Sequence, residues 1–330
     1  MQFNRQGLLI TLGVWLAVSV ILALFIGRYP TPSILTLDRL LSDDLAQRLV
    51  WNLRLPRVFS ALMLGMSLSA AGTVLQMLFG NPLIEPGFLG VSQGAAFGAA
   101  FSIIFLGNAA WLVQLNAALF AFVGLGFSYF LARRVRFGGW VLRLVLAGIA
   151  VSALFSSGVG ILKYMADPLR QLQEITFWLL GGLWSSTWAQ TLSILPVVLV
   201  GLTIAFLMRW RLNLLSLTDE AAFSLGASPN RERILLLFAV VSATAAVISA
   251  AGVVGWVGLI IPHIARRIFG ADARYSLPAA MLIGGWFVLA CDTLARTLMA
   301  GEIPLGILTS LIGAGLFMIM MLSRGFRLER

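Results

Sequence analysis

Charged side chains are scarce in this sequence. They make up 11% of its 330 residues, whereas hydrophobic residues make up 60%. A water-soluble domain carries about 25% charged residues, so this chain cannot cover a surface that faces water. A helix that crosses a lipid bilayer instead needs roughly 20 consecutive, mostly apolar residues. The composition therefore indicates an integral membrane protein.

Histidine and cysteine are rarer still, because His263 and Cys291 are the only ones. One cysteine excludes a disulfide within the chain and leaves the redox compartment undetermined. One histidine without acidic neighbours cannot build a metal site, so we expect a structural or interface role for His263 and no bound metal. An enzyme would need a cluster of nucleophile, base or metal ligands. The chain also lacks a Gly-x-x-x-x-Gly-Lys phosphate loop, which excludes an ATP site of its own.

Long runs without charge are what the sequence does contain. They cover residues 6–27, 58–84, 86–132, 144–162, 175–208, 234–265, 275–291 and 303–323. The first is too long for a signal peptide and is expected to remain as a span. The third holds two helices that turn near Gly107 and Asn108, the fifth holds one helix and a shorter piece, and the sixth holds a full helix and a broken one. The runs predict an all-α membrane protein of about ten transmembrane helices in a single domain, residues 1–330.

The basic residues predict the orientation of these helices. Fifteen of the 23 Lys and Arg fall at Arg5 or in the intervals 133–143, 209–233, 266–274 and 324–330, which lie on one side of the predicted spans. Cytoplasmic loops carry an excess of Lys and Arg, so we expect both termini in the cytoplasm. The cations lie between apolar runs and not on one amphipathic face, which argues for membrane lipid and against nucleic acid as the partner.

Several arginines break this pattern on the expected outer side, among them Arg54, Arg57 and Arg296. Taken alone, such residues favour anchoring at lipid headgroups, or internal ion pairs with Asp43, Asp44 or Glu302. Forked hydrogen bonds from outer arginines to the acidic groups of a docking protein are the other interpretation. Asp292 lies inside an apolar run, and a pair with Arg296 four residues later on the same helix face explains it.

The longest of the cytoplasmic intervals, residues 212–233, has the pattern of two short helices. Thr218 is a helix N-cap, and Asp219 and Glu220 in the first turn match the helix dipole. Gly226 suits the C-terminal cap, and Pro229 suits the first turn of the next helix. Helices this short are marginal in water without a partner surface, so this pair is expected to dock against another protein.

Several motifs resemble the FecCD-type permeases of ATP-binding-cassette importers, and the resemblance covers essentially the whole chain. Glu220-Ala-Ala-x-x-x-Gly226 resembles the signature of importer permeases in general. The longer matches are Leu53–Arg57 with Gly80–Gly94, Phe177–Gly182, Gly252–Arg266, and Leu294–Thr297 with Glu302–Gly306. Permeases of this kind serve the uptake of iron-siderophores, haem, vitamin B12 and, in some cases, molybdate.

The resemblance implies an assembly. It predicts a homodimer of ten-helix subunits with two ATPase subunits inside and one extracytoplasmic substrate-binding protein outside. The chain would then lie in the cell membrane of a bacterium or archaeon, the inner membrane if the cell is Gram-negative. ATP would be used by the partner subunits, with no cofactor on this chain. An iron chelate such as a siderophore is the first choice of cargo, and haem, cobalamin and an oxyanion such as molybdate stay open.

The resemblance also implies roles for particular residues. ATPase coupling falls to Thr218, Asp219, Glu220, Ala221, Ala222 and Gly226. Docking of the binding protein falls to Arg54, Arg57 and Arg296. Asn81 and Leu83 match a cytoplasmic gate, and a second gate falls near Trp140. Ser152, Ser156 and Ser157 are candidates for lining the pathway, and a role in close helix packing, which small polar residues also permit, has equal weight. For the stripe Gly90, Gly94 and Gly98 we expect close helix packing.

An ion-coupled secondary transporter is the alternative from a different class. Such a protein normally carries ionisable residues that face the bundle interior, and often internally repeated broken helices. In the sequence only Asp292 fits that description, and it has a partner in Arg296. The pattern therefore favours a passive conduit driven by partner ATPases.

Overall fold

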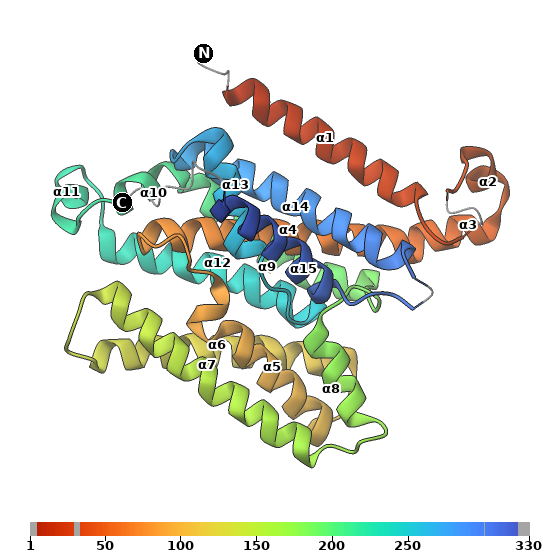
Figure 1. The fold of residues 1–330 in the computed structure, drawn as a ribbon, viewed down its shortest axis with the longest axis horizontal. Coiled ribbons are helices and arrows are strands. Elements are labelled where there is room, and N and C mark those ends of the chain that lie inside the picture. Colours follow the sequence, from red (N-terminus) through yellow and green to blue (C-terminus); the bar gives the residue numbers. More distant parts are fainter. Residues whose placement is uncertain (1–4, 30–33, 300, 323–330) are drawn as a thin grey trace.

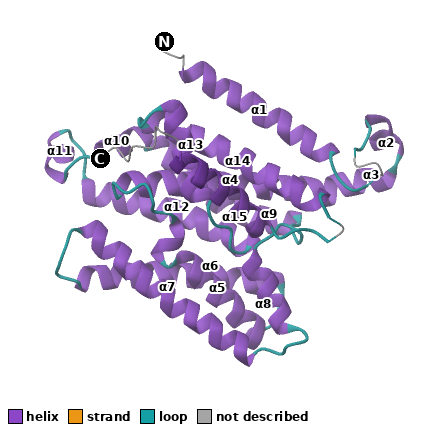
Figure 2. Cartoon of the chain, in the orientation of Figure 1, coloured by secondary structure: helices purple, strands orange, loops and turns teal. Residues whose placement is uncertain are grey.

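A computed structural model describes residues 5–29, 34–299 and 301–322. Within these ranges the chain is helical, and its only β pairing is an isolated bridge between Ile26 and Ile34 (Figure 2). Eight helices are long and apolar enough to cross a membrane. The tail arginines Arg324, Arg327 and Arg330 lie outside the described residues.

The eight long helices are joined by shorter ones. One of the long helices is the continuous stretch Asp44–Leu78, which is formed by α3 (Asp44–Leu49), a π-helical turn (Val50–Arg54) and α4 (Leu55–Leu78). The other seven are α1 (Arg5–Phe25), α6 (Ala110–Arg134), α7 (Trp140–Met165), α9 (Trp188–Leu207), α12 (Pro229–Ala251), α14 (Ala273–Thr297) and α15 (Leu305–Leu322). The shorter ones are α2 (Leu37–Ser42), η2 (Pro86–Leu89), α5 (Val91–Phe101) continued by η3 (Ser102–Leu106), α8 (Gln171–Leu180), α10 (Arg209–Leu215), α11 (Asp219–Ser224) and α13 (Val257–Phe269).

These boundaries confirm how the long apolar runs divide. The run 86–132 turns at Gly107, the run 175–208 gives α8 and α9, and the run 234–265 gives α12 and the shorter α13. One expectation was wrong: the helix that begins at Pro229 is the long α12 and not a second short helix. The run of apolar residues after Arg233 continues the helix into the bundle, so the short pair is α10 and α11.

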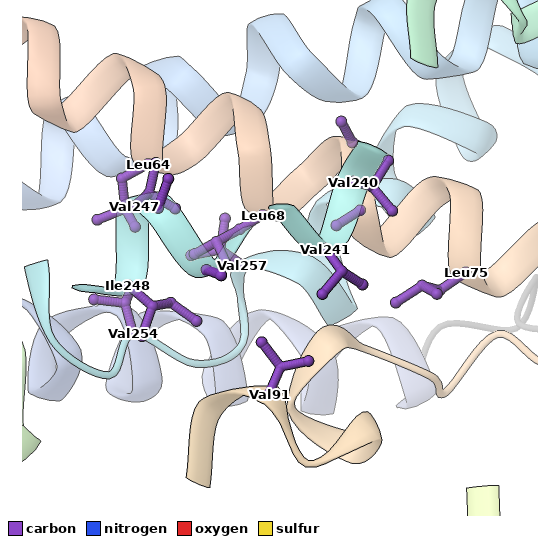
Figure 3. Packing of buried hydrophobic residues seen from close by; sticks show 14 of the residues in the cluster. Leu64, Leu68, Leu75, Val91, Val240, Val241, Val247, Ile248, Val254 and Val257 are labelled. Carbon is purple, nitrogen blue, oxygen red and sulfur yellow. The ribbon is translucent and has the colours of Figure 1, made fainter. Parts of the chain in front are cut away.

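Helix α4 forms the centre of the bundle. It packs against α14, α12, α13 and α9, while α1 lies on the outer side of α14 (Figure 1). Leu64 and Leu68 of α4 lie beside Val247 of α12 and Val257 of α13 (Figure 3), and all four are buried. The segments α5, α6, α7 and α8 form a second group below this core in Figure 1, joined to it through α12.

Glycines permit the closest contacts between helices. A Cβ atom on Gly94 or Gly98 would overlap the backbone of Phe120 or Asn116 in α6, which confirms the packing role predicted for the glycine stripe. A Cβ on Gly72 would likewise overlap the carbonyl of Gly258. The start of α13 is therefore fixed against the middle of α4.

Two short helices thus begin inside the bundle and not at its ends. Helix α5 follows segment 79–90, which starts at the end of α4 and contains only the short η2, and α13 follows the irregular segment 252–256. Trp256 ends the second segment with φ of 71°, the only positive φ at a non-glycine residue in the described part of the chain. Irregular backbone at this depth is tolerated where it is buried in protein or lines a cavity.

Gln76 satisfies the backbone that Pro262 leaves open in α13. A proline has no N–H, so the carbonyl of Gly258, four residues earlier, loses its helical donor. The Gln76 amide nitrogen lies 3.3 Å from this oxygen and 3.2 Å from that of Leu259, and the Gln76 side-chain oxygen accepts from Arg266 at 2.5 Å. One side chain of α4 therefore holds the broken helix in place.

Replacing Gln76 by leucine is expected to destabilise the folded chain by about 2–3 kcal/mol, because it leaves buried carbonyl and guanidinium groups without partners. Gln114→Leu is the matched control, since Gln114 donates only to the exposed hydroxyl of Ser193. The midpoint of thermal unfolding in detergent measures both. Equal midpoints for the two variants would contradict the role of Gln76.

Candidate functional site

Helix α11 is displayed at one end of the molecule (Figure 1). The Thr218 hydroxyl accepts from the N–H of Ala221 at 3.4 Å, which confirms the predicted N-cap. Gly226 has φ of 80°, in the left-handed region that favours glycine after a helix. Ala222 is fully buried beneath the helix, whereas Phe223 is 72% exposed. A short, well-capped helix with an exposed aromatic side chain is a surface suited to docking.

Polar contacts fix α10 and α11 to the long helices. Arg233 of α12 donates to Asp219 at 2.6 Å and to the carbonyl of Leu215 at 3.0 Å. Asn213 of α10 donates to Asp272 at 2.8 Å and accepts from the N–H of Ala273 at 2.8 Å. Helix α11 is thereby joined to α12, and α10 is joined to the start of α14.

The pKa of Asp272 is lowered to about 2. The cause is chiefly the hydrogen bond from the Arg274 side chain, with further bonds from the Arg274 N–H and from Asn213, against a smaller opposing effect of burial. A carboxylate with a lowered folded-state pKa stabilises the fold above its unfolded pKa, here near 3.8, and the contribution disappears as pH falls toward 2.

Asp272→Asn is therefore expected to be less stable than the parent at neutral pH and to lose less stability between pH 4 and pH 2. Tryptophan fluorescence melting over this range measures the difference, using the ten tryptophans of the chain. Parallel pH profiles for the two proteins would show that Asp272 makes no ionisation-linked contribution.

Two of the arginines expected on the outer side cap the end of α1. The last four carbonyls of a helix have no partner within it. Arg54 donates to the carbonyl of Leu24 at 2.6 Å, and Arg296 donates to that of Ala23. The carbonyl of Leu22 accepts from the N–H of Ile26, and the carbonyl of Phe25 accepts from the N–H of Leu35. The guanidinium charges also complement the negative end of the helix dipole.

Arg57 forms the centre of an internal ion cluster. Its Nε lies 2.9 Å from Asp292 and its Nη1 lies 2.8 Å from Glu302. The alternative of an internal pair with Glu302 is thus confirmed for Arg57. The predicted pair of Asp292 with Arg296 is present at a longer 3.9 Å, and Arg57 is the closer partner. Asp292 is only 1% exposed, so its charge depends on these arginines.

The residues expected at the gate and pathway lie on segment 79–90 and on α7. The Asn81 side chain accepts from the N–H of Leu83 at 2.9 Å. The side chain of Leu83 is 46% exposed at this turn. Ser152 faces the Gly87 carbonyl at 3.4 Å, so it packs α7 against this segment. Ser156 lies on an exposed face of α7.

Two cavities are lined in part by residues of segment 252–256. One of about 330 Å³ is lined by Ser152, Ser92 and Gln93, and one of about 710 Å³ is lined by Ser310 and apolar residues of α15. Both are also lined by Glu85, Val253 and Gly255. Figure 3 shows Val254 of this segment next to Ile248 of α12.

Glu85 is the residue that the sequence analysis missed. It lines both cavities, and no described cation lies within ion-pair distance of its carboxylate. In the sequence it separates the apolar runs 58–84 and 86–132, so each run taken alone has no charge. Its position between two membrane-length runs was the available signal.

Comparisons with known proteins agree with this geometry. A model of the FecCD transport family matches residues 15–323. The molybdate import system permease protein MolB of Haemophilus influenzae is 36% identical, covering 96% of each chain, and the hemin transport system permease protein HmuU of Yersinia pestis is 38% identical, covering 94% of this chain and 95% of its own.

A solved structure of a metal-chelate type ABC transporter in an inward-facing conformation has the same fold. It superposes with a TM-score of 0.88 at 37% identity, over 95% of this chain and 98% of its own. These relatives are transport components and not enzymes. With a family match over nearly the whole length, the chain belongs to the FecCD transport family and is the permease of an ABC importer.

Proposed function

We propose that the chain forms, as a homodimer, the translocation pathway of an importer for a metal chelate. Ten segments cross the membrane, the eight long helices together with the shorter segments 91–106 and 257–269, and both termini lie in the cytoplasm. The first choice of cargo is an iron chelate. Haem, cobalamin and molybdate are the alternatives, because the names of the relatives give different cargoes. The membrane is the cell membrane of a bacterium or archaeon.

The observation that carries this proposal is the separation of three features along the bundle. The capped α11 lies at one end, the arginines Arg54, Arg57 and Arg296 lie at the other, and the cavities at Glu85 lie between them. ATPase subunits dock at α11, and motion passes through Arg233 to α12, which leads directly into segment 252–256.

A substrate-binding protein docks at the opposite end. Arg57 and its partner Glu302 are the contact point, because Glu302 is 36% exposed. Arg54 and Arg296 act less directly, since both hold the end of α1. The gate residues Asn81 and Leu83 respond to the motion of α12 through segment 79–90, and Ser152 and Ser156 of α7 line the pathway.

A pull-down of the tagged chain from gently solubilised native membranes tests this proposal. We expect two copies of the permease with two ATPase subunits, and a binding protein whose bound metal is read by mass spectrometry. A permease that stays without an ATPase under every mild condition would contradict the proposal.

A further inference from the structure

Helix α6 exposes an apolar stripe along its whole length. Trp111, Leu115 and Leu119 are exposed in its first half, and Phe127 and Phe130 are exposed in its second half. The intervals of three, four and eight residues place all five side chains on one helical face. A membrane-spanning helix can turn such a face toward lipid, because lipid tails are as apolar as the side chains themselves.

Arginines stacked on aromatic rings end this stripe. Arg133 and Arg134 form the last turn of α6, and Arg136 follows two residues later. The Cζ atom of Arg133 lies 5.7 Å from the centre of the Tyr129 ring, and that of Arg134 lies 5.1 Å from the centre of the Phe130 ring. All three arginines are exposed. Long cationic side chains at the end of a membrane span extend toward the lipid headgroups.

Loop 135–139 joins α6 to α7 at the same end of the bundle as α11 (Figure 1). The side chain of Phe137 is 63% exposed in this loop. Arg143 donates to the carbonyl of Val135 at 3.0 Å, which closes the base of the loop. An exposed aromatic ring among cations suits the interface of a membrane, where aromatic side chains lie at the level of the headgroups.

No carboxylate of the chain balances the charge of these arginines. The sequence has no Asp or Glu from residue 86 to residue 166, and Arg133, Arg134 and Arg136 form no ion pair within the described residues. Arginine stays protonated in proteins, so the three positive charges persist at neutral pH. Other arginines at this end of the bundle do pair with carboxylates: Arg211 with Glu232, Arg233 with Asp219, and Arg274 with Asp272.

We propose that the end of α6 and loop 135–139 form a binding site for an anionic phospholipid. The three arginines bind the phosphate headgroup through charge-assisted hydrogen bonds, Phe137 inserts between headgroups, and the acyl chains lie along the apolar stripe. Clusters of basic residues beside a membrane span attract anionic lipids in this way. The ring of Trp140, the first residue of α7, lies edge-on to that of Tyr129 with 5.5 Å between their centres. A lipid held at Arg133 therefore also stabilises the start of α7.

Binding of two short-chain lipids to the purified chain in detergent tests this proposal. Native mass spectrometry gives the affinities of dioctanoyl phosphatidylglycerol, which is anionic, and of dioctanoyl phosphatidylcholine, which is neutral overall. We expect the anionic lipid to bind at least about tenfold more tightly, because each basic residue near an anionic headgroup strengthens attachment by about fivefold. The preference should weaken as the salt concentration rises, since these charges are exposed to solvent.

The triple variant Arg133→Gln, Arg134→Gln and Arg136→Gln should lose most of this preference. The matched control removes the same number of charges at the opposite end of the bundle through Arg39→Gln, Arg48→Gln and Arg170→Gln. It should keep the preference, because acidic residues accompany these arginines: Asp38, Asp43 and Asp44 lie in the segment of the first two, and Glu174 pairs with the third. Replacing Arg133, Arg134 and Arg136 by lysine should also keep most of the preference, since the positive charges remain.

Equal affinity of the parent chain for the two lipids would overturn the proposal, whether or not the variants fold. A preference that survives in the triple glutamine variant would overturn it as well, because the anionic lipid would then bind elsewhere. Inorganic phosphate that displaces phosphatidylglycerol at equal concentration would show a site for free anions and not for lipid. If the triple glutamine variant keeps the lipid preference but no longer retains an ATPase subunit, this surface docks a protein and the lipid assignment is wrong.

Discussion

Replacing Arg57 by methionine is expected to destabilise the folded chain by about 3–5 kcal/mol. Removing one partner of a buried ion pair leaves the other charge without compensation. Asp292 is 1% exposed and would keep only Arg296, at 3.9 Å. The two partners of Arg57 lie on α14 and on the loop before α15, so the loss of Arg57 should also loosen the contact between these two segments.

The single cysteine measures this effect directly. Cys291 is 1% exposed and precedes Asp292, so its reaction with a fluorogenic maleimide during heating reports the opening of α14. The double variant Arg57→Met with Asp292→Asn should recover part of the loss, because the uncompensated charge of Asp292 is removed, whereas Arg296 loses its ion-pair partner. Glu302→Gln should cost under about 1 kcal/mol, as expected for a partly exposed pair. A single Arg57 variant as stable as the parent would show that the cluster contributes little.

Replacing Gly226 by valine is expected to reduce ATP-driven uptake at least tenfold while ATP hydrolysis continues. The φ of 80° is disfavoured for a β-branched residue, at a cost on the order of 1–2 kcal/mol. A Cβ there would meet no atom within 4 Å, so the effect comes from the backbone alone. The altered turn would also move the Gly226 carbonyl from Arg211 and misplace α11 against the ATPase.

Gly226→Asn is the matched control, because asparagine tolerates the left-handed conformation far better than valine. It should keep most of the uptake. Glu220→Ala should also uncouple hydrolysis from uptake, since Glu220 forms no ion pair within the described residues and its carboxylate is free to contact a partner. Uptake that stays coupled in both Gly226→Val and Glu220→Ala would contradict the role of α11.

Local patterns in the sequence predicted much of this structure. Apolar runs located the helices, and Thr218 and Gly226 predicted the ends of α11 because capping depends on neighbouring residues alone. Contacts between distant residues could not be predicted in the same way. Asp292 pairs with Arg57 across 235 positions, so a search along its own helix found only Arg296. The position of Glu85 beside two cavities depends on how segments 79–90 and 252–256 meet, which no local pattern contains.

Uptake by the assembled transporter in proteoliposomes tests the central claim most directly. The permease is reconstituted with its ATPase and a binding protein loaded with radioactive iron chelate, and the ATPase sites face an ATP-filled lumen. We expect the label to accumulate inside the proteoliposomes and not to be exported into the bath. This accumulation should require ATP, and it should continue when proton and sodium ionophores are present. Accumulation that proceeds without ATP and collapses with an ionophore would contradict ATP-driven import and indicate an ion-coupled transporter.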